Sequence, residues 1–332
     1  MKKILLVTND TSLTGAPILL LELAKYLSTI QHFIIEFWSV FPIPSTQHSM
    51  TDQFESIGSV KFFNGVYPSQ KDIQLAKEIY DLIICNTVET TQLCVELNAI
   101  MWYHEMFIPD IQMFNRIKKV VTLSNKHTNF LKLLGASTIF CSLHSMFNNQ
   151  IININNNKNI SSNVSIIVIG SFIQRKNQLG ALDIVKPYYN IHLTMIGSFK
   201  DYETGLTTYY QSVKDKVKYL HMEDRVSLID TQTHDNVLKY ISNCDILLCP
   251  SFHDTYPVCV IEALEHGKTV LLTKNTCLDL DEILVKPYSS RSCSLQNMSD
   301  MLGRLLSNEL YKRKERLQEY DYAKHVKHAF FE

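Results

Sequence analysis

Short apolar runs alternate along the chain with stretches whose apolar residues recur at helical spacing. This alternation is typical of strand, crossover helix, strand units, and therefore of a parallel sheet that is covered on both faces. The runs that we expect to form strands are 4–8, 33–38, 82–86, 100–104 and 120–124 in the first half, and 165–170, 192–197, 226–230, 245–250 and 269–273 in the second. The stretches predicted to form helices between the first strands are 19–27, 73–80 and 129–134.

One polar segment interrupts this alternation. Half of the positions in 148–163 are Asn, a residue that favours turns over regular structure, so we predict a linker there. It separates two Rossmann-like, doubly wound α/β domains, residues 1–147 and residues 164–310, and residues 311–332 form a helical tail that could pack back on the first domain. Such sheets bind ligands beyond the carboxyl ends of their strands, so we expect a cleft between the domains.

Composition excludes several classes of protein. The 332 residues, 45% of them hydrophobic and 20% charged, suit two ordinary globular cores. The net charge of -1 argues against a nucleic-acid partner. No stretch approaches the ~20 apolar residues of a membrane span, and the cysteines show no Cys-x-x-Cys pair. We expect a cytoplasmic protein, and peripheral association with the inner face of a membrane stays open.

A glycine follows the first predicted strand. Gly15 stands between the strand 4–8 and a helix, and Pro17 suits the first turn of that helix. Glycine lets a ligand approach the backbone closely, and the free N–H groups of a first turn attract an anion. A glycine before a helix is also a common structural feature, so the residue alone does not decide between the two interpretations.

Two cations follow the first predicted strand of the second domain. Arg175 and Lys176 lie between the strand 165–170 and a helix that begins near Asn177. Together with the helix dipole they could meet a phosphate. The plainer interpretation is a solvated charge pair in a loop, and both remain open.

The segment PSFHDTYPVCVIEALEHGK, residues 250–268, carries two acids across a loop that turns into a helix. Glu262 lies among apolar neighbours, so we expect it to be at least partly buried and to need a partner, which could be ribose hydroxyls, a Lys or a backbone amide. Asp254 could accept from sugar hydroxyls or make a local turn bond. The turn that would face the same cleft as Lys176 comprises Tyr256, Pro257, Val258 and Cys259.

His104 ends the predicted strand 100–104, on the cleft side of the first domain. A lone His after an apolar strand is more often a hydrogen-bonded structural residue than a catalyst. No metal site is predicted, because the histidines at 221, 234 and 253 lack zinc spacing and the Asp-x-Asp at 279–281 is too short a match.

Taken together, these segments resemble the GT-B glycosyltransferases, and within them the large retaining, nucleotide-sugar-dependent family 4. The likeness covers nearly the whole chain and is strongest over 165–275, where IIVIGSFIQRKNQ and HDTYPVCVIEALEHGKTVLLT follow the family's order and spacing. It implies two Rossmann-like domains that face a central cleft. It also implies transfer of a hexose from a UDP- or GDP-linked donor to a glycan, a lipid-linked sugar or a protein glycan, as in polysaccharide biosynthesis.

The resemblance implies a role for individual residues. Lys176 matches the lysine that holds the donor diphosphate, and Gly15 matches the glycine against which that diphosphate sits. Asp254 matches the acid that contacts the transferred sugar, Glu262 the acid that contacts the ribose, and His104 the histidine near the reacting sugar. In the family a front-face reaction retains the anomeric configuration, and the scheme requires neither a metal ion nor another cofactor.

Two positions depart from the family pattern. Ser171 stands where the family commonly has Arg, and Asp254 is one methylene shorter than the usual Glu. Arg175, four residues after Ser171, is the alternative cation for the phosphates. These departures keep two other hypotheses open, a nucleotide-sugar-binding scaffold without activity and, from another enzyme class, a sugar-nucleotide epimerase.

Overall fold

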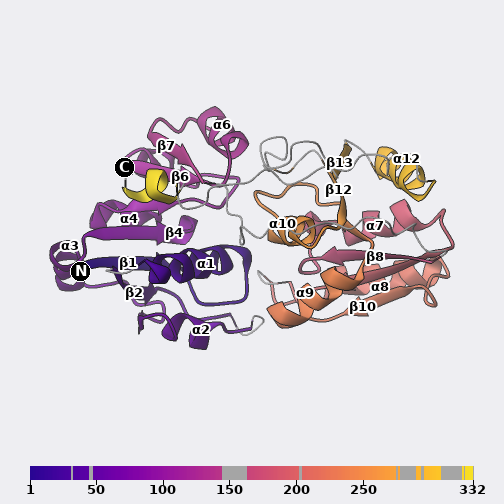
Figure 1. Cartoon of the computed structure of the whole chain (residues 1–332), viewed down its shortest axis with the longest axis horizontal. Coiled ribbons are helices and arrows are strands. Elements are labelled where there is room, and N and C mark those ends of the chain that lie inside the picture. The colour runs from indigo at the N-terminus through magenta and orange to yellow at the C-terminus, as the bar shows by residue number, and fades with distance from the viewer. Residues whose placement is uncertain are drawn as a thin grey trace. The chain divides into compact units, whose positions relative to one another are not determined.

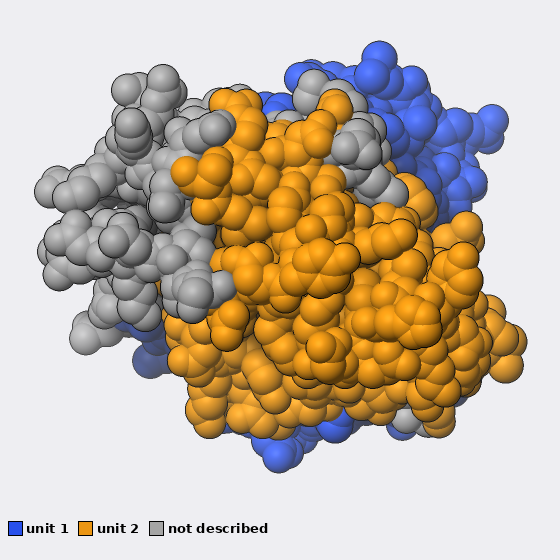
Figure 2. Space-filling model, turned by 90° about the vertical axis from the view of Figure 1, so that its right-hand side faces the viewer, with its two compact units in different colours: residues 1–147, 321–332 blue, residues 148–320 orange. Residues whose placement is uncertain are grey.

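The computed structural model describes residues 1–30, 33–44, 48–143, 163–201, 204–273, 276, 289–292, 295–307, 324 and 326–331. The chain divides into two compact units, unit 1 with residues 1–147 and 321–332 and unit 2 with residues 148–320 (Figure 2). The predicted linker 148–163 lies outside the described residues except for Asn163, and so do the Asp-x-Asp at 279–281 and most of the predicted tail 311–332.

Unit 1 contains a parallel sheet with the strand order β3-β2-β1-β4-β5-β6-β7 (Figure 1). Its strands are β1 (Lys2–Thr8), β2 (Phe33–Ser39), β3 (Ser59–Phe62), β4 (Leu82–Asn86), β5 (Ile100–Trp102), β6 (Lys119–Thr122) and β7 (Ile139–Ser142). Its helices are α1 (Gly15–Thr29), α2 (Thr51–Glu55), α3 (Gln70–Ile79), η1 (Val88–Thr90), α4 (Thr91–Leu97), α5 (Ile111–Phe114), α6 (Asn125–Leu133) and the π-helical η3 (Lys327–Phe331).

The five strands predicted for the first half are confirmed, with one correction at β5. This strand ends at Trp102, so His104 lies in the loop beyond it rather than in the strand. The edge strands β3 and β7 were not predicted, because each has only four residues and neither contains a fully buried one.

The core of unit 1 forms on both faces of the sheet. Leu5 and Val7 of β1 pack into a buried cluster with residues of α3, α4, α5 and α6. Ile4 and Leu6 are equally buried and point to the other face, because side chains alternate along a strand. On that face η3 adds Phe330, whose ring lies edge-on to Trp102 with the centroids 5.8 Å apart.

Unit 2 repeats the architecture, with the strand order β10-β9-β8-β11-β12-β13 and all pairs parallel. Its strands are β8 (Val164–Ile169), β9 (Ile191–Ile196), β10 (Val226–Ile229), β11 (Ile246–Cys249), β12 (Thr269–Thr273) and β13 (Ser289–Ser292). Its helices are η2 (Gln174–Lys176), α7 (Gln178–Val185), α8 (Thr208–Tyr219), α9 (His234–Asn243), α10 (Val258–Glu265) and α12 (Leu295–Leu306). The prediction of two doubly wound, parallel-sheet domains is thus confirmed.

Each sheet has a point where the strand order reverses, between β1 and β4 in unit 1 and between β8 and β11 in unit 2. In both places an Asn side chain ties the two loops together. Asn86 Nδ2 donates to Ala16 O at 3.1 Å, and Asn177 Nδ2 donates to Pro250 O at 3.0 Å. Ligands of doubly wound sheets bind beside such reversals, so these two loop pairs are where a site is to be sought.

Among the described residues, no helix is both long enough and apolar enough to span a bilayer.

Candidate functional site

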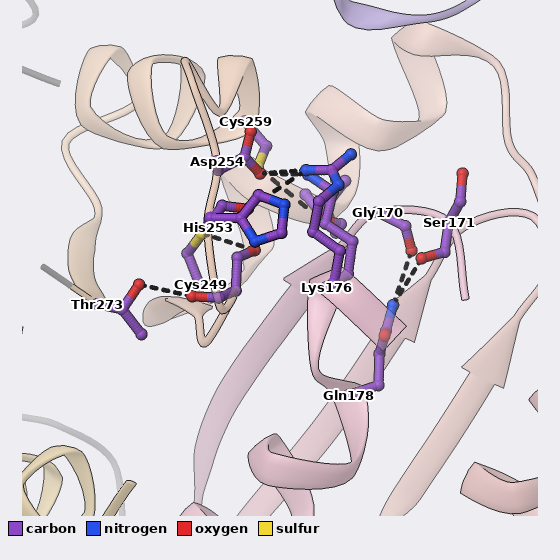
Figure 3. Close-up of polar contacts among 12 residues, drawn as sticks. Gly170, Ser171, Lys176, Gln178, Cys249, His253, Asp254, Cys259 and Thr273 are labelled. Carbon is purple, nitrogen blue, oxygen red and sulfur yellow. Dashed lines mark hydrogen bonds and ion pairs between the residues drawn. The ribbon is translucent and has the colours of Figure 1, made fainter. Parts of the chain in front are cut away.

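Lys176 and Asp254 form an ion pair at the carboxyl end of the unit 2 sheet (Figure 3). Lys176 Nζ lies 2.5 Å from Asp254 Oδ2, and their side chains are only 17% and 10% exposed. Burial raises the pKa of Asp254, but the cations Lys176 and Arg175 outweigh burial and hold this pKa below its ordinary value. Burial lowers the pKa of Lys176, yet the Asp254 carboxylate leaves it raised overall. Both groups are therefore charged at neutral pH.

Arg175 reaches the same carboxylate. Its Nη1 lies 3.4 Å from Asp254 Oδ2 and donates to His253 O at 3.4 Å. The backbone joins the two loops as well, because Phe252 N donates to Arg175 O at 2.9 Å. Two cations facing one carboxylate leave a local positive charge, which suits an anionic ligand.

Two glycines at neighbouring strand ends allow a close approach, Gly170 to the stem of Lys176 and Gly197 to the backbone of Gly170. A Cβ on Gly170 would lie 3.1 Å from Lys176 Cδ, and one on Gly197 would lie 2.1 Å from Gly170 O. Gln178 fixes the same turn, since its Nε2 donates to the carbonyls of Gly170 and Ser171 at 3.1 and 3.0 Å (Figure 3). The lysine stem thus runs closely over the backbone of Gly170, where a side chain would crowd it.

Helix α10 begins beside the end of β8, where Cys259 Sγ contacts Ile169 O at 4.0 Å. Pro257 is its N-cap residue, supplies no side-chain hydrogen bond and is followed by no acid in the first turn. The first N–H groups of a helix have no partner within the helix and carry its positive dipole end. This turn is therefore open to an anion, and the buried Tyr256 and Pro257 hold its backbone in place.

Glu262 lies one turn further along α10 and is 5% exposed, which matches the expectation of a buried acid. Its partner within unit 2 is His234, the first residue of α9, whose Nε2 lies 2.5 Å from Glu262 Oε1. Neither a Lys nor a backbone amide takes this place in the described part of the chain.

In unit 1, Gly15 is exposed at the first position of α1, and Thr14 before it makes no side-chain cap. The preceding loop is ordered by its own polar groups, since Asp10 Oδ1 accepts from Ser12 N at 2.8 Å. The start of α1 therefore offers uncapped N–H groups, as α10 does in unit 2.

His104 lies just beyond β5, and its ring centroid is 5.0 Å from that of Trp102. Burial, followed by the effect of His127, lowers the pKa of His104 to about 3, so its imidazole is neutral at physiological pH. Among the described residues, buried side-chain atoms without a hydrogen-bond partner include His104 Nε2, Trp102 Nε1, Asn86 Oδ1 and Thr87 Oγ1. These four atoms lie at the carboxyl ends of the adjacent strands β4 and β5, so several buried polar atoms without a hydrogen-bond partner lie at this edge of the sheet.

Glu105 is an acid that sequence reasoning missed. Its Oε2 accepts from His104 N at 3.1 Å, and its carbonyl is 2.8 Å from His127 Nε2. Burial, reinforced by the charge of Glu89, raises the pKa of Glu105 to about 8. Glu105 directly follows the predicted strand 100–104, and the sequence pattern does not indicate which side chain after a strand is buried.

No group of three or more His, Cys, Asp or Glu side chains in the described residues is arranged to hold a metal ion.

The sequence model of the family "Glycosyl transferases group 1" matches residues 149–325, more than half of the chain. The chain belongs to the group 1 glycosyl transferases. A comparison with curated proteins by sequence finds no match.

Solved structures resemble this group 1 glycosyl transferase over nearly its whole length. HepE of Anabaena in complex with UDP-glucose has a TM-score of 0.74 at 15% identity, over 99% of this chain and 96% of HepE. A glycosyltransferase from Rickettsia africae has a TM-score of 0.72 at 15% identity, over 99% and 92%. The apo lipopolysaccharide outer core galactosyltransferase WaaB has a TM-score of 0.67 at 16% identity, over 98% of both chains. These similarities confirm the predicted GT-B fold.

Within this glycosyl transferase the predicted site residues fall into three groups. Lys176, Arg175 and Asp254 meet directly, with the turn at 256–259 beside them. Glu262 shares α10 with that turn but is held by His234. Gly15 and His104 lie in unit 1, at the strand ends described above.

Proposed function

We propose that this glycosyl transferase moves a hexose from a nucleoside diphosphate sugar to an acceptor hydroxyl, with retention at the anomeric carbon and without a metal ion or other cofactor. The observation that carries the proposal is the Lys176–Asp254 pair, buried at the strand-order reversal of unit 2 beside the uncapped start of α10. This combination of a held cation and free helix amides suits a diphosphate.

In the proposed reaction, negative charge develops on the leaving diphosphate. As the bond between the anomeric carbon and the phosphate oxygen breaks, negative charge builds on the leaving group, and preorganised positive groups lower that barrier. Lys176, Arg175 and the amides of Val258 and Cys259 would supply them. The raised pKa of Lys176 supports this role, since the lysine stays protonated although its side chain is largely buried.

The two acids would hold the sugar and the ribose. We assign the transferred sugar to Asp254 and the ribose to Glu262. Because Asp254 already pairs with Lys176, we assign it to hydroxyl binding rather than covalent attack. The acceptor oxygen would then bond to the carbon on the face that the diphosphate leaves, and its proton would pass to the leaving phosphate oxygen.

UDP is the first nucleotide to test, because the similar HepE was crystallised with UDP-glucose. The acceptor would be a glycan or a lipid-linked sugar in polysaccharide biosynthesis, reached in the cytoplasm or at the inner face of a membrane. In unit 1 we assign ligand contacts to Gly15 and His104.

A thermal-shift measurement with UDP and GDP tests donor binding first. A ligand at 100 times its Kd adds about 2.7 kcal/mol to the free energy of unfolding, so a true donor nucleotide raises the Tm measurably. Incubation with the matching sugar nucleotides and a panel of acceptors follows, with products identified by mass spectrometry and NMR. Product with the donor's anomeric configuration supports the proposal.

The same assay separates the alternatives. Nucleotide binding without hydrolysis or transfer across the panel would favour a non-catalytic scaffold. Conversion of the donor sugar in the absence of an acceptor would identify an epimerase. No response to any nucleotide would overturn the proposed donor site.

A further inference from the structure

The carboxylate of Glu262 is held on one side only. Its Oε1 lies 2.5 Å from His234 Nε2, whereas Oε2 makes no hydrogen bond with any residue that the structure describes. Glu262 is 5% exposed, and a largely buried carboxylate is stable when its oxygens accept hydrogen bonds. A carboxylate can accept more hydrogen bonds than the imidazole supplies, so the remaining capacity suits a ligand that donates them.

The position of His234 is set independently of Glu262. It is the first residue of α9, and Thr233 before it caps the helix by accepting from Asn236 N at 3.4 Å. The Glu262 side of the pair is fixed as well, because His266 Nδ1 lies 2.8 Å from Glu262 O within α10. Two ordered helix segments thus bring the imidazole and the carboxylate together.

We propose that His234 is a positioning residue that fixes the Glu262 carboxylate, so that Oε2 is presented to the hydroxyls of the donor's ribose. This inference rests on the proposed function, because it takes the ligand at Glu262 to be a nucleoside diphosphate. A carboxylate that can rotate loses conformational freedom when it binds a diol. One that is already held by an imidazole loses less, so the nucleotide binds more tightly.

Calorimetric titration of UDP against UDP lacking its 2′ and 3′ hydroxyls tests this role. We expect His234→Ala to weaken UDP binding roughly tenfold, as for the loss of one hydrogen bond to a charged group, and to leave binding of the dideoxy nucleotide unchanged. His234→Gln, whose amide can still donate, should recover part of the affinity.

A double-mutant cycle with Glu262→Gln asks whether His234 acts through Glu262. If it does, the double variant binds UDP no more weakly than Glu262→Gln alone. The matched control is His192→Ala, because His192 is an exposed histidine near the amino end of β9 that also has one polar partner, Ser227 Oγ at 2.9 Å. It should leave the Kd for both nucleotides unchanged.

The outcomes separate the two proposals. If the wild-type chain binds UDP but His234→Ala and His234→Gln bind it as tightly, the positioning role is overturned and the donor site stands. An equal loss for both nucleotides, or additive losses in the cycle, overturns it too. If the wild-type chain binds no UDP, the UDP assignment and this inference fail together. Tm values for each variant show that it is folded.

Discussion

Lys176 and Asp254, 78 positions apart in the sequence, lie with Nζ and Oδ2 2.5 Å apart at the strand-order reversal of unit 2. The pair is charged and largely buried, so each group neutralises the other when no ligand is bound. A diphosphate that enters this position must share the lysine with the aspartate. Under the proposed function, catalysis and the stability of this loop pair would therefore be coupled through the same two side chains.

Lys176→Ala should lower turnover by at least ~10²–10³, because under the proposed function it removes the preorganised donor to the leaving diphosphate. It should also lower Tm, since the carboxylate of Asp254 stays buried with Arg175 alone beside it. Nucleotide release during transfer, measured well below the Tm of the variant, checks the first effect. Lys186→Ala, at the exposed lysine that follows α7 as its C-cap, is the matched control and should change neither quantity. Near-normal turnover in Lys176→Ala would contradict the phosphate role.

Asp254→Asn should separate nucleotide binding from transfer. The substitution removes a negative charge beside the proposed diphosphate, so we expect UDP to bind at least as tightly as to the wild-type chain. Transfer should fall by ~10²-fold, because the amide holds the sugar less well than the carboxylate. Calorimetry gives the Kd and steady-state assays give kcat. Weaker UDP binding together with unchanged kcat would reverse the assignment.

Gly197→Ala should destabilise unit 2 strongly. Its Cβ would lie 2.1 Å from Gly170 O, which is backbone and cannot move aside like a flexible side chain. We expect a loss of about 1–3 kcal/mol or more in the free energy of unfolding, measured by denaturant titration. Gly205→Ala provides the comparison, because that glycine also has a positive φ of 69° but no atom within 4 Å of the added Cβ. An equal loss in both variants would show that crowding at Gly197 does not matter.

Glu105 makes the stability of unit 1 depend on pH. Its pKa rises from 4.5 to about 8 in the folded chain, so between these values the folded state keeps a proton that the unfolded state has lost. Stability from this group therefore falls as pH rises from about 5 to about 8 and is constant above. Glu105→Gln should flatten the fall in Tm across this window. Glu55→Gln, at an exposed glutamate of α2, should leave the fall as it is in the wild-type chain.

The strands at the centre of each sheet could be predicted from sequence because both their faces are buried. Residues 82–85 of the run 82–86 and residues 246–249 of the run 245–250 are apolar without interruption, which is the pattern of a buried parallel strand. The edge strands could not be predicted in this way, because their sequences are short and contain few apolar residues. β3 includes Lys61 and β13 is mostly serine, and what makes each a strand is backbone pairing with its neighbour, β2 or β12.

The local features of the candidate site could be predicted from the sequence, but the contacts between side chains from distant segments could not. The turn before α10 and the glycine before Lys176 follow from backbone preferences that act within a few residues. The contact between His234 and Glu262 arises from the packing of α9 on α10, 28 positions apart, and no spacing rule indicates it. From the sequence, His234 was considered only as a zinc ligand, whereas in the structure its imidazole lies against the carboxylate of Glu262.

The composition of unit 1 affects how such enzymes can be recombined. Residues from both ends of the chain belong to unit 1, and Phe330 and Phe331 lie against Trp102 and Phe33 there. Unit 2 is therefore an insertion within unit 1 rather than a second half appended to it. An exchange of unit 2 between relatives needs two crossovers, one near residue 148 and one near residue 320, and a single crossover would pair Trp102 with a foreign C-terminal segment.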